Sequence, residues 1–214
     1  MGTRAKAAEI QPGGDTRERV LRAGFEAFRE LGFDGASTLE IATRAKVSKR
    51  ELYALFADKQ SIVVECIKWR TRQIQLPLEL PRPGDAQALS ATLARFGTAL
   101  LTGVCDPGVL AVFRFAIAEA QRMPDIAKTL NERGREPSRR IFMDLVSKAQ
   151  EDGLLQRSPP AEISEFFFSI LWGDLLLRLL MGTARLPTKA EIEQRARHAA
   201  ERLMATYAKA GKPR

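Results

Sequence analysis

The chain has 214 residues, which is enough for one or two domains with a proper hydrophobic core. Hydrophobic residues make up 45% and charged residues 28%, a globular composition that excludes a wholly disordered chain. The 34 lysines and arginines outnumber the 26 aspartates and glutamates and give a formal net charge of +8, which suits a polyanionic partner.

Few residues are available for metal or nucleophilic chemistry. The single histidine, His198, lies far in sequence from the two cysteines, Cys66 and Cys105. We therefore expect no disulfide scaffold, no metal site and no cofactor, and histidine-based catalysis has little support. Each cysteine is most simply a small buried apolar residue, and a redox-sensing thiol is the alternative.

The chain begins with a polar stretch and contains one long apolar run. Residues 1–13 lack the apolar core of a signal peptide and are expected to form a flexible arm. The run 163–181 is long enough to span a bilayer, but Glu165, Asp174 and Arg178 within it would each cost roughly 2.5–3.5 kcal/mol at the bilayer centre. We predict a helix buried in protein and a cytoplasmic location.

Apolar residues recur with helical periodicity in the N-terminal part of the chain. The four predicted helices are the one whose apolar face runs from Val20 to Leu31, then 38–45, 49–56, and one from Asp58 past Trp69. Gly32 ends the first of them. The prolines and glycine of 76–84 stop the fourth, so we place the domain boundary there, between domains at 14–74 and 75–214.

Five more helices are expected beyond this boundary. They cover 86–103, 107–120, 124–152, 161–182 and 188–209. A break before Pro137 is an alternative within the third of them. Strand-type alternation of useful length is absent from the sequence. The predicted fold is all-α with about nine helices: an N-terminal three-helix domain with a helix-turn-helix, followed by a larger helical domain.

Residues 37–56 contain two helix starts within twenty positions. Ser37 with Glu40, and Ser48 with Glu51, have the spacing of a capping box, in which each side chain accepts a hydrogen bond from the backbone N–H of the other. The turn between the two helices has room for only about three residues. Two short helices joined in this way indicate a helix-turn-helix.

The second of these helices has a polar face formed by Lys49, Arg50 and Tyr53, opposite its apolar residues. The first residues of the second helix in a helix-turn-helix reach base edges in the major groove. Lysine and arginine can pair there with guanine, and tyrosine can stack or donate a hydrogen bond to a phosphate. Arg44 and Lys46 extend the basic run. A solvated structural face is the alternative, but placement on a capped outward face favours DNA binding.

The spacing of these residues resembles a known family. It is carried by Thr16, Arg17, Val20, Leu21, Phe28, Gly32, Phe33, Ser37, Thr38, Ile41, Ala42, Ala45, Val47, Ser48, Lys49, Leu52, Tyr53, Phe56 and Lys59. Over roughly 14–74 the chain resembles the DNA-binding domain of the TetR family of bacterial transcriptional regulators. The resemblance implies a homodimer that binds a palindromic operator and releases it when a small ligand enters the second domain. It implies DNA contacts at Ser37, Thr38, Ser48, Lys49, Arg50, Tyr53 and Lys59.

Two positions depart from the family pattern. Lys46 stands where the family usually has glycine in the turn, which lysine tolerates if its φ is negative or modestly strained. Arg50 replaces a small residue and is expected to alter operator preference. Lys59 follows Asp58, a candidate cap, so the free N–H groups of that helix and Lys59 predict a phosphate-binding end, with a plain surface lysine as the alternative.

The middle helices of the second domain supply a candidate ligand pocket. Its predicted lining consists of Trp69, Phe96, Phe113, Phe142 and Met143, with Arg114 and Glu119 as polar selectors. For each of these residues taken singly, core packing is the simpler interpretation. The run 113–125 resembles a TetR subgroup whose ligands vary, so it names no inducer.

The last two predicted helices carry more apolar surface than one chain is expected to bury, which suggests that a second subunit covers part of it. The helix 161–182 is apolar almost all round, and 188–209 carries a stripe of small residues. Similar helix pairs in TetR-like proteins form a four-helix bundle between subunits; a core within one chain is the alternative. The predicted interface residues are Phe167, Leu171, Asp174, Leu175, Arg178, Ala196, Ala199 and Leu203. Asp174 and Arg178 have the spacing of an i, i+4 ion pair.

Together these features predict a homodimeric, ligand-responsive DNA-binding regulator, a repressor rather than an activator. Its partners are operator DNA, a second copy and a small-molecule inducer. A constitutive DNA-binding protein without a ligand is the first alternative. A helical enzyme is the second, and it lacks a Gly-rich phosphate loop and a His/Cys constellation in the sequence.

Overall fold

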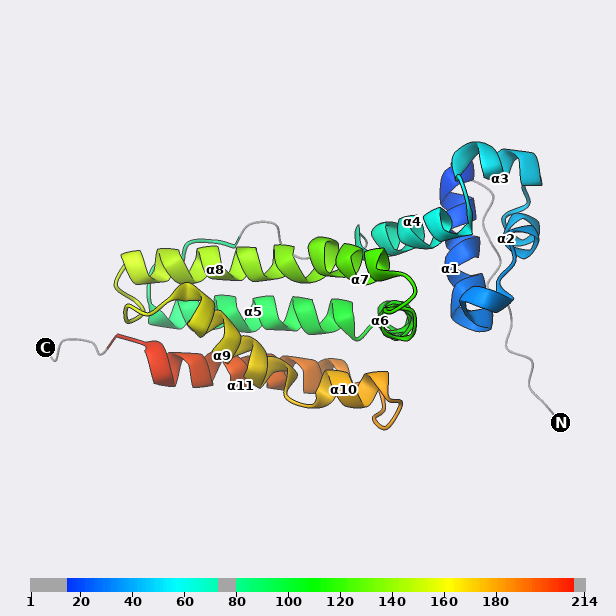
Figure 1. Cartoon of the computed structure of the whole chain (residues 1–214). Coiled ribbons are helices and arrows are strands. Elements are labelled where there is room, and N and C mark those ends of the chain that lie inside the picture. The colour runs from blue at the N-terminus through cyan, green and yellow to red at the C-terminus, as the bar shows by residue number, and fades with distance from the viewer. Residues whose placement is uncertain (1–14, 73–79, 210–214) are drawn as a thin grey trace, which may run out of the picture. The chain divides into compact units, whose positions relative to one another are not determined.

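The computed structural model describes residues 15–72 and 80–209, and its regular structure there is helical apart from one isolated bridge between Leu155 and Ala208. The chain divides into two compact units, one ending at Cys66 and the other beginning at Ile67 (Figure 1). The predicted arm 1–13 and the predicted boundary between 74 and 75 lie outside the described residues.

The N-terminal unit contains the predicted helix-turn-helix. Its helices are α1 (Thr16–Gly35), α2 (Thr38–Ala45), α3 (Lys49–Leu55) and the first part of α4 (Lys59–Arg72). These bounds confirm the four predicted helices to within a few residues. Gly32, with φ 71° and ψ 179°, interrupts α1 as expected, although one more turn follows it. Only glycine adopts such a conformation readily, because it has no Cβ.

Three helices of this unit meet at Arg17, near the start of α1. Its Nη2 lies 2.8 Å from Glu65 Oε2 on α4, and its Nη1 donates to the carbonyl oxygen of Leu55 at the end of α3. The guanidinium also lies 4.8 Å from the centroid of the Phe56 ring, a cation–π contact. Around it, Val20, Ile41 and Leu52 are fully buried. This packing fixes α3 on the rest of the unit.

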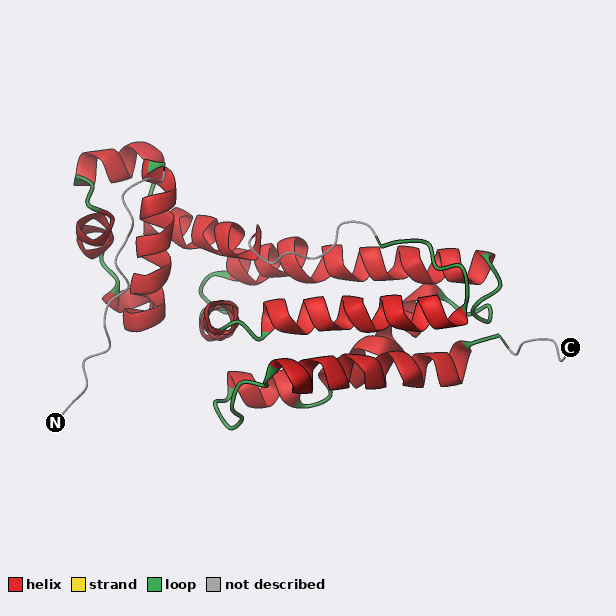
Figure 2. Cartoon of the chain, turned by 180° about the vertical axis from the view of Figure 1, so that it is seen from behind, coloured by secondary structure: helices red, strands yellow, loops and turns green. Residues whose placement is uncertain are grey.

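The C-terminal unit is a bundle in which α8, α5 and α11 run side by side in both views (Figures 1 and 2). Its helices beyond α4 are α5 (Ala86–Val104), α6 (Pro107–Ala118), α7 (Pro124–Leu130), the π-helical turn η1 (Asn131–Arg135), α8 (Glu136–Glu151), α9 (Pro160–Trp172), α10 (Leu175–Leu180) and α11 (Lys189–Tyr207). At Gly97 of α5 an added Cβ would lie 3.1 Å from Ala196 Cβ of α11, so the small residues let these two helices approach closely.

The described residues form eleven α-helices, where the sequence predicts about nine. The expected helix over 124–152 contains η1 directly before Pro137, because proline has no N–H to continue the α-helical ladder. The alternative of a break before Pro137, rather than one continuous helix, is therefore the one that the structure shows. The expected helix over 161–182 breaks at Gly173, whose φ of 46° and ψ of −125° separate α9 from α10.

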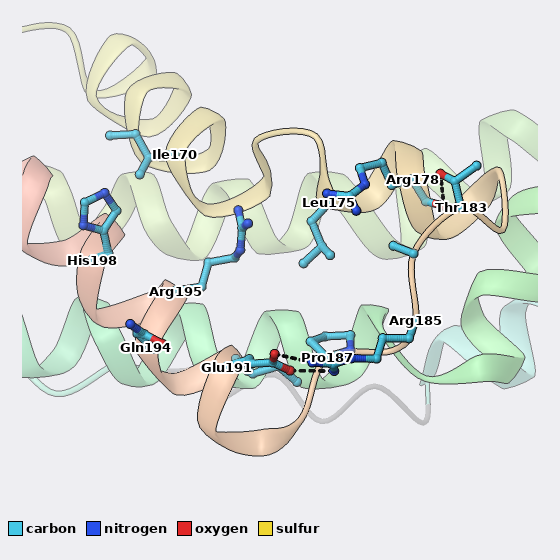
Figure 3. A pocket seen from close by; sticks show the side chains of 12 residues that line it. Ile170, Leu175, Arg178, Thr183, Arg185, Pro187, Glu191, Gln194, Arg195 and His198 are labelled. Carbon is cyan, nitrogen blue, oxygen red and sulfur yellow. Dashed lines mark hydrogen bonds and ion pairs between the residues drawn. The ribbon is translucent and has the colours of Figure 1, made fainter.

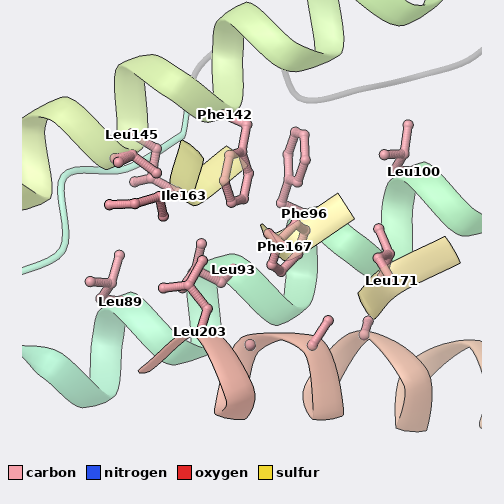
Figure 4. Packing of buried hydrophobic residues seen from close by; sticks show 14 of the residues in the cluster. Leu89, Leu93, Phe96, Leu100, Phe142, Leu145, Ile163, Phe167, Leu171 and Leu203 are labelled. Atoms are coloured by element: carbon pink, nitrogen blue, oxygen red, sulfur yellow. The ribbon is translucent and has the colours of Figure 1, made fainter. Parts of the chain in front are cut away.

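The core of the C-terminal unit is a cluster of aliphatic and aromatic side chains from α5, α8, α9 and α11 (Figure 4). Phe142 stacks on Phe167 with ring centroids 4.5 Å apart, and Phe96 packs against both. Among the described residues no single helix is long and apolar enough to span a membrane, although α5 and α6, bent by 69°, pass by length and composition as a pair.

The first turn of α11 predicts a pH effect on stability. Thr188 and Glu191 form a capping box, and Arg185 binds both oxygens of Glu191 at 2.6 and 2.8 Å. The Arg185 guanidinium and the Thr188 N–H and hydroxyl lower the pKa of Glu191 from 4.5 to about 2. The stabilisation is therefore present above about pH 4.5 and is lost as the pH falls towards 2.

We expect the urea midpoint of unfolding to fall less steeply over this acid range in Glu191→Gln than in the wild type. Glu201→Gln, which removes an exposed carboxylate from the same helix, is the control and should behave as the wild type does. Equal acid sensitivity of the wild type and Glu191→Gln would contradict the role of this cap.

Candidate nucleic-acid interface

The outward face of α3 consists of the side chains that the sequence assigns to it. Lys49, Arg50 and Tyr53 are exposed, whereas Leu52 on the opposite face is fully buried. The Tyr53 hydroxyl lies 3.1 Å from Thr38 Oγ1, so the two predicted contact residues join the start of α2 to the middle of α3. The arrangement presents two cations and one phenol on a rigid, exposed helix start.

The capping box of α3 forms completely. The Ser48 hydroxyl accepts the Glu51 N–H at 3.1 Å and donates to Glu51 Oε2 at 2.8 Å, and the Ser48 N–H donates to the same oxygen. These hydrogen bonds lower the pKa of Glu51. The Ser48 hydroxyl proton is donated to Glu51, so Ser48 sets the start of α3. Its contact with DNA stays a prediction.

The cap of α2 is only half of a capping box. Ser37 Oγ accepts the Glu40 N–H at 3.0 Å, which leaves the Ser37 hydroxyl proton available for a partner. The Glu40 carboxylate does not return to Ser37, because Arg44 binds it instead at 2.8 Å. The Ser37 hydroxyl can therefore still donate a hydrogen bond to DNA, whereas the Ser48 hydroxyl already donates to Glu51.

Arg44 is held by two carboxylates. Its Nε donates to Glu40 Oε1 and its Nη1 donates to Glu30 Oε2 at 2.7 Å, and its side chain is only 25% exposed. The hydrogen bond from Arg44 lowers the pKa of Glu30. The charge of Arg44 is thus balanced within the domain, where the residue braces α2 against α1, and its contact with DNA stays a prediction.

Lys59 also has a partner inside the N-terminal unit. Its Nζ donates to the Phe33 carbonyl oxygen at 2.6 Å and lies 4.2 Å from the centroid of the Phe33 ring. Asp58 caps α4 as predicted, since its carboxylate accepts the Ser61 N–H at 2.7 Å. Two ammonium protons of Lys59 remain for other partners. Lys59 thus braces α4 against the end of α1, and its phosphate contact stays a prediction.

Lys46 lies in the left-handed region with φ 55° and ψ 47°, and it is the one non-glycine residue with positive φ among those that the structure describes. Of the two ways in which a lysine could replace the family's glycine here, a negative φ is therefore ruled out and a modestly strained backbone is left. The Lys46 N–H bonds back to the carbonyl oxygens of Ala42 and Thr43, which closes α2 and aims the chain into α3. This conformation costs a residue with a Cβ about 1–2 kcal/mol.

Replacing Lys46 by glycine is expected to raise the free energy of unfolding by about 1 kcal/mol. The removed strain exceeds the extra conformational entropy that glycine brings to the unfolded chain. Urea unfolding followed by circular dichroism measures the difference. Ala54→Gly, at an exposed helical position of α3, is the matched control and should destabilise by about 0.5–1 kcal/mol. A destabilised Lys46→Gly would show that the turn is unstrained.

The predicted ligand-pocket residues of the C-terminal unit separate into two groups. Phe96 and Phe142 are fully buried with their rings against Phe167 (Figure 4), which favours core packing, and their role as pocket lining stays a prediction. The remaining apolar residues of the predicted lining are half-buried: Trp69, Phe113 and Met143.

The two predicted polar selectors have different surroundings. Arg114 donates to the carbonyl oxygens of Leu179 and Leu180 at 2.6 and 2.9 Å, so it closes the end of α10. Its role as a ligand selector stays a prediction. Glu119 caps the end of α6, and its buried Oε2 has no hydrogen-bond partner, although it lies 4.0 Å from Nη1 of Arg122 in a loose ion pair. A buried carboxylate oxygen of this kind is costly without a donor, so Glu119 remains a candidate ligand contact.

Most of the predicted dimer-interface residues lie inside one chain. The fully buried ones are Phe167, Leu171, Ala196, Ala199 and Leu203. Their own chain already covers them, which favours a core within one chain, the alternative to an interface, and their part in a dimer contact stays a prediction. Leu175 is half-buried, and Asp174 and Arg178 are exposed and form the predicted i, i+4 pair at 3.6 Å.

The sequence reasoning missed one exposed apolar residue of α10, a second one directly after this helix, and a hollow beside it. Leu177 is 61% exposed and Met181 is 63% exposed. The apolar run from Leu175 to Leu180, interrupted only by Arg178, was the available signal. The hollow, of about 730 Å³, lies among α9, α10, the segment that follows α10, and α11 (Figure 3).

The two cysteines are buried in the structure. Cys66 Sγ donates to the Leu21 carbonyl oxygen at 3.2 Å, and burial raises the pKa of this thiol far above its usual range. Burial also raises the pKa of Cys105, to about 11. Both thiols are therefore protonated at neutral pH and favour the interpretation as small apolar residues. Within the described ranges no group of three or more His, Cys, Asp or Glu side chains could hold a metal ion.

A short α2, a tight left-handed turn and a capped α3 with exposed basic residues define the class of helix-turn-helix DNA-binding proteins. Residues 20–66 match the family model described as bacterial regulatory proteins of the tetR family. Residues 91–209 match the model of the C-terminal domain of AefR-like transcriptional repressors. The chain belongs to the TetR family of bacterial transcriptional regulators, with an N-terminal helix-turn-helix DNA-binding domain and a C-terminal ligand-binding domain.

Known proteins of similar length align with most of the chain. The uncharacterized HTH-type transcriptional regulator YdeS of Bacillus subtilis (strain 168) is 26% identical over 167 residues, 78% of this chain and 79% of YdeS. The structure of a TetR transcriptional regulator from Agrobacterium tumefaciens matches with a TM-score of 0.79 and 25% identity, covering 90% of this chain and 94% of that chain. The structure of the flavonoid-responsive regulator FrrA matches with a TM-score of 0.74 and 27% identity, covering 92% of this chain and 98% of FrrA.

Proposed function

We propose that this regulator is a homodimeric repressor that binds a near-palindromic operator in the cytoplasm and leaves it when a small ligand binds. The observation that carries the proposal is the exposed face of Lys49, Arg50 and Tyr53 on a helix whose start is fixed by a complete capping box. A rigid helix start of this kind is suited to major-groove reading, because base contacts need side chains in fixed positions.

The residues of this face have different proposed roles. Arg50 has five donors in a planar fork and pairs with guanine O6 and N7. Lys49, Lys46 and the remaining protons of Lys59 contact phosphates, as do the hydroxyls of Ser37, Thr38 and Tyr53. Only Arg50 is therefore expected to specify a base.

Arg50→Ala is expected to weaken operator binding by roughly 1–3 kcal/mol and to relax the preference at one base position in each half-site. Lys49→Ala should weaken binding to all sequences alike and reduce the salt dependence by about one unit per subunit, because it removes one phosphate contact. Competition titrations with operator variants separate the two effects. Arg197→Ala, which removes an exposed arginine of α11, is the control.

Selection of bound sites from random DNA tests the proposed function directly. A two-fold dimer should enrich a near-palindrome whose half-site centres are about 34 Å apart, or a multiple of it. No enrichment, with similar affinity for every duplex, would favour a constitutive DNA-binding protein without a ligand. Turnover of a small molecule without DNA binding would favour the enzyme alternative.

The proposed dimer forms through the exposed side of α10. Leu177 of α10 and Met181, which caps the end of this helix, are four residues apart and both mostly exposed. This exposure is unfavourable for two large apolar side chains unless a partner covers them. A second copy would place the same two residues opposite each other in a two-fold contact. Asp174 and Arg178 of the same helix supply polar contacts at the edge.

Ligand control is proposed to act through α6. FrrA is named as flavonoid-responsive, which supports a small-molecule ligand for the C-terminal domain of this chain. Half-buried Trp69, Phe113 and Met143 with Glu119 remain the candidate contacts. Asp106 caps α6, accepting the N–H groups of Gly108 and Val109, and also binds Arg70 of α4. A shift of α6 would thus move α4, and a coupling of about 3 kcal/mol would lower operator affinity roughly 150-fold.

A further inference from the structure

A large apolar side chain is exposed on α2, directly beside the candidate nucleic-acid interface. Leu39, the second residue of α2, is 58% exposed, although the burial of a leucine side chain is favourable. The residue before it is Thr38, whose Oγ1 lies 3.1 Å from the hydroxyl oxygen of Tyr53 on the outward face of α3. Leu39 therefore lies next to the point at which α2 meets the face that is proposed to read DNA.

The outer side of α2 is divided into two strips, each formed by residues four positions apart. In one strip Glu40 and Arg44 form an ion pair, and Arg44 also binds Glu30 of α1 at 2.7 Å, so this strip is turned towards α1. The other strip consists of Leu39 and Thr43, and both residues are exposed. The Leu39–Thr43 strip is therefore the part of α2 that is open to a partner.

The Leu39–Thr43 strip has an apolar character in spite of its threonine. The Thr43 hydroxyl donates to the Leu39 carbonyl oxygen at 2.8 Å, so its proton is already used. The Leu39 side chain can recognise a base only through an apolar contact. Thymine is the base that presents such a group in the major groove, its C5-methyl.

We propose that Leu39 specifies a thymine in each half-site of the operator by covering its C5-methyl group. This inference rests on the proposed function, because it requires a defined operator with α3 in the major groove. Among the polar and basic residues of the interface, Arg50 alone is assigned to a base, and Leu39 adds a second base position that depends on burial instead of hydrogen bonding. The exposed cations Lys49 and Arg50 on the adjoining face favour a polyanion over an apolar protein surface as the occupant.

The test replaces each thymine of the selected operator in turn by deoxyuridine, which removes only the C5-methyl group. At one position in each half-site, the replacement is expected to weaken binding of the wild-type chain about fourfold, the effect of losing one buried methyl group. Leu39→Ala should bind the thymine and uracil operators equally at this position. Because Leu39 is mostly exposed and alanine is a strong helix former, the variant keeps the fold.

Two further variants serve as controls. Leu39→Met keeps a long apolar side chain on α2 and should retain most of the difference between thymine and uracil. Ile117→Ala removes a similarly exposed aliphatic side chain from α6, in the C-terminal unit, and should show the full wild-type difference. A role of Leu39 in folding alone would change the affinity for all duplexes and leave the ratio of the thymine and uracil affinities as it is in the wild type.

The reading of thymine by Leu39 would be overturned if no thymine of the half-site depended on its methyl group, or if Leu39→Ala kept every such dependence of the wild type. An equal loss of affinity for all duplexes in Leu39→Ala would place the side chain against the sugar–phosphate backbone and would also overturn it. In each of these cases the wild type still prefers its operator to random DNA, so the proposed function stands. Loss of that preference in the wild type would overturn both.

Discussion

Ala199→Asp is expected to unfold the C-terminal unit rather than only separate two subunits. Ala199 is fully buried within one chain, on the side of α11 that packs in the core of the bundle. An aspartate there would be an unpaired buried charge, which costs about 3–5 kcal/mol and is a large part of the stability of a domain of this size. Loss of helical circular dichroism at neutral pH measures the effect.

Leu177→Asp is the matched variant for this prediction, since it places the same charge on the exposed side of α10. It should leave the helical signal intact and raise the dimer dissociation constant, as measured by sedimentation velocity. A folded, monomeric Ala199→Asp would instead show that Ala199 lies in the interface, and would restore the assignment that follows from the sequence alone.

Phe142→Ala is expected to lower the free energy of unfolding by about 3–5 kcal/mol. The Phe142 ring is fully buried, 4.5 Å from the Phe167 centroid and 5.4 Å from that of Phe96, so its removal leaves a cavity at the centre of the aromatic cluster. Urea unfolding followed by circular dichroism gives the difference. Met143→Ala, at the half-buried neighbouring position, is the control and should cost distinctly less.

The same experiment distinguishes a packed core from a ligand pocket. A residue that lines an open pocket already contacts empty space, so its truncation removes few contacts. A loss below about 1 kcal/mol for Phe142→Ala would therefore contradict the core assignment and support the pocket that the sequence predicts.

The helix-turn-helix could be predicted from the sequence because its signals are local. Ser48 and Glu51 lie within one turn of the chain, and the side chains that they orient, Lys49 and Arg50, are next to them. Gly32 and Pro137 likewise act on the backbone at their own positions. Helix bounds and the outward face of α3 depend on such short-range effects, so the structure agrees with them.

The partners of Arg44, Arg114 and Lys59 could not be predicted because they lie far away in sequence. Arg44 binds Glu30, 14 residues earlier, and Arg114 binds carbonyls 65 and 66 residues later. A basic side chain looks the same in the sequence whether a carboxylate, a helix end or DNA neutralises it. Only the fold distinguishes these cases.

The sequence also cannot distinguish a helix face that is buried within one chain from a face that is buried by a second subunit, because both have the same stripe of apolar residues. The stripe of Ala196, Ala199 and Leu203 indicates a buried helix face, but periodicity does not say which helix covers it, and the structure places α5 and α9 there. The break at Gly173 turns α10 so that Leu177 and Met181 face outward. A continuous helix, which the apolar composition of this stretch favours, would have given a different exposed face.

The most direct test of sequence-specific recognition by α3 is a competition titration at about 150 mM salt. The wild-type chain is titrated with the selected operator against a duplex of the same length and composition in shuffled order. The operator should bind at least about a thousandfold more tightly, with two subunits per duplex. Arg50→Ala should reduce this preference by about 5- to 150-fold, which corresponds to its expected loss of roughly 1–3 kcal/mol. Equal affinity for the two duplexes, or an unchanged preference in Arg50→Ala, would contradict base reading by Arg50 on the exposed face of α3.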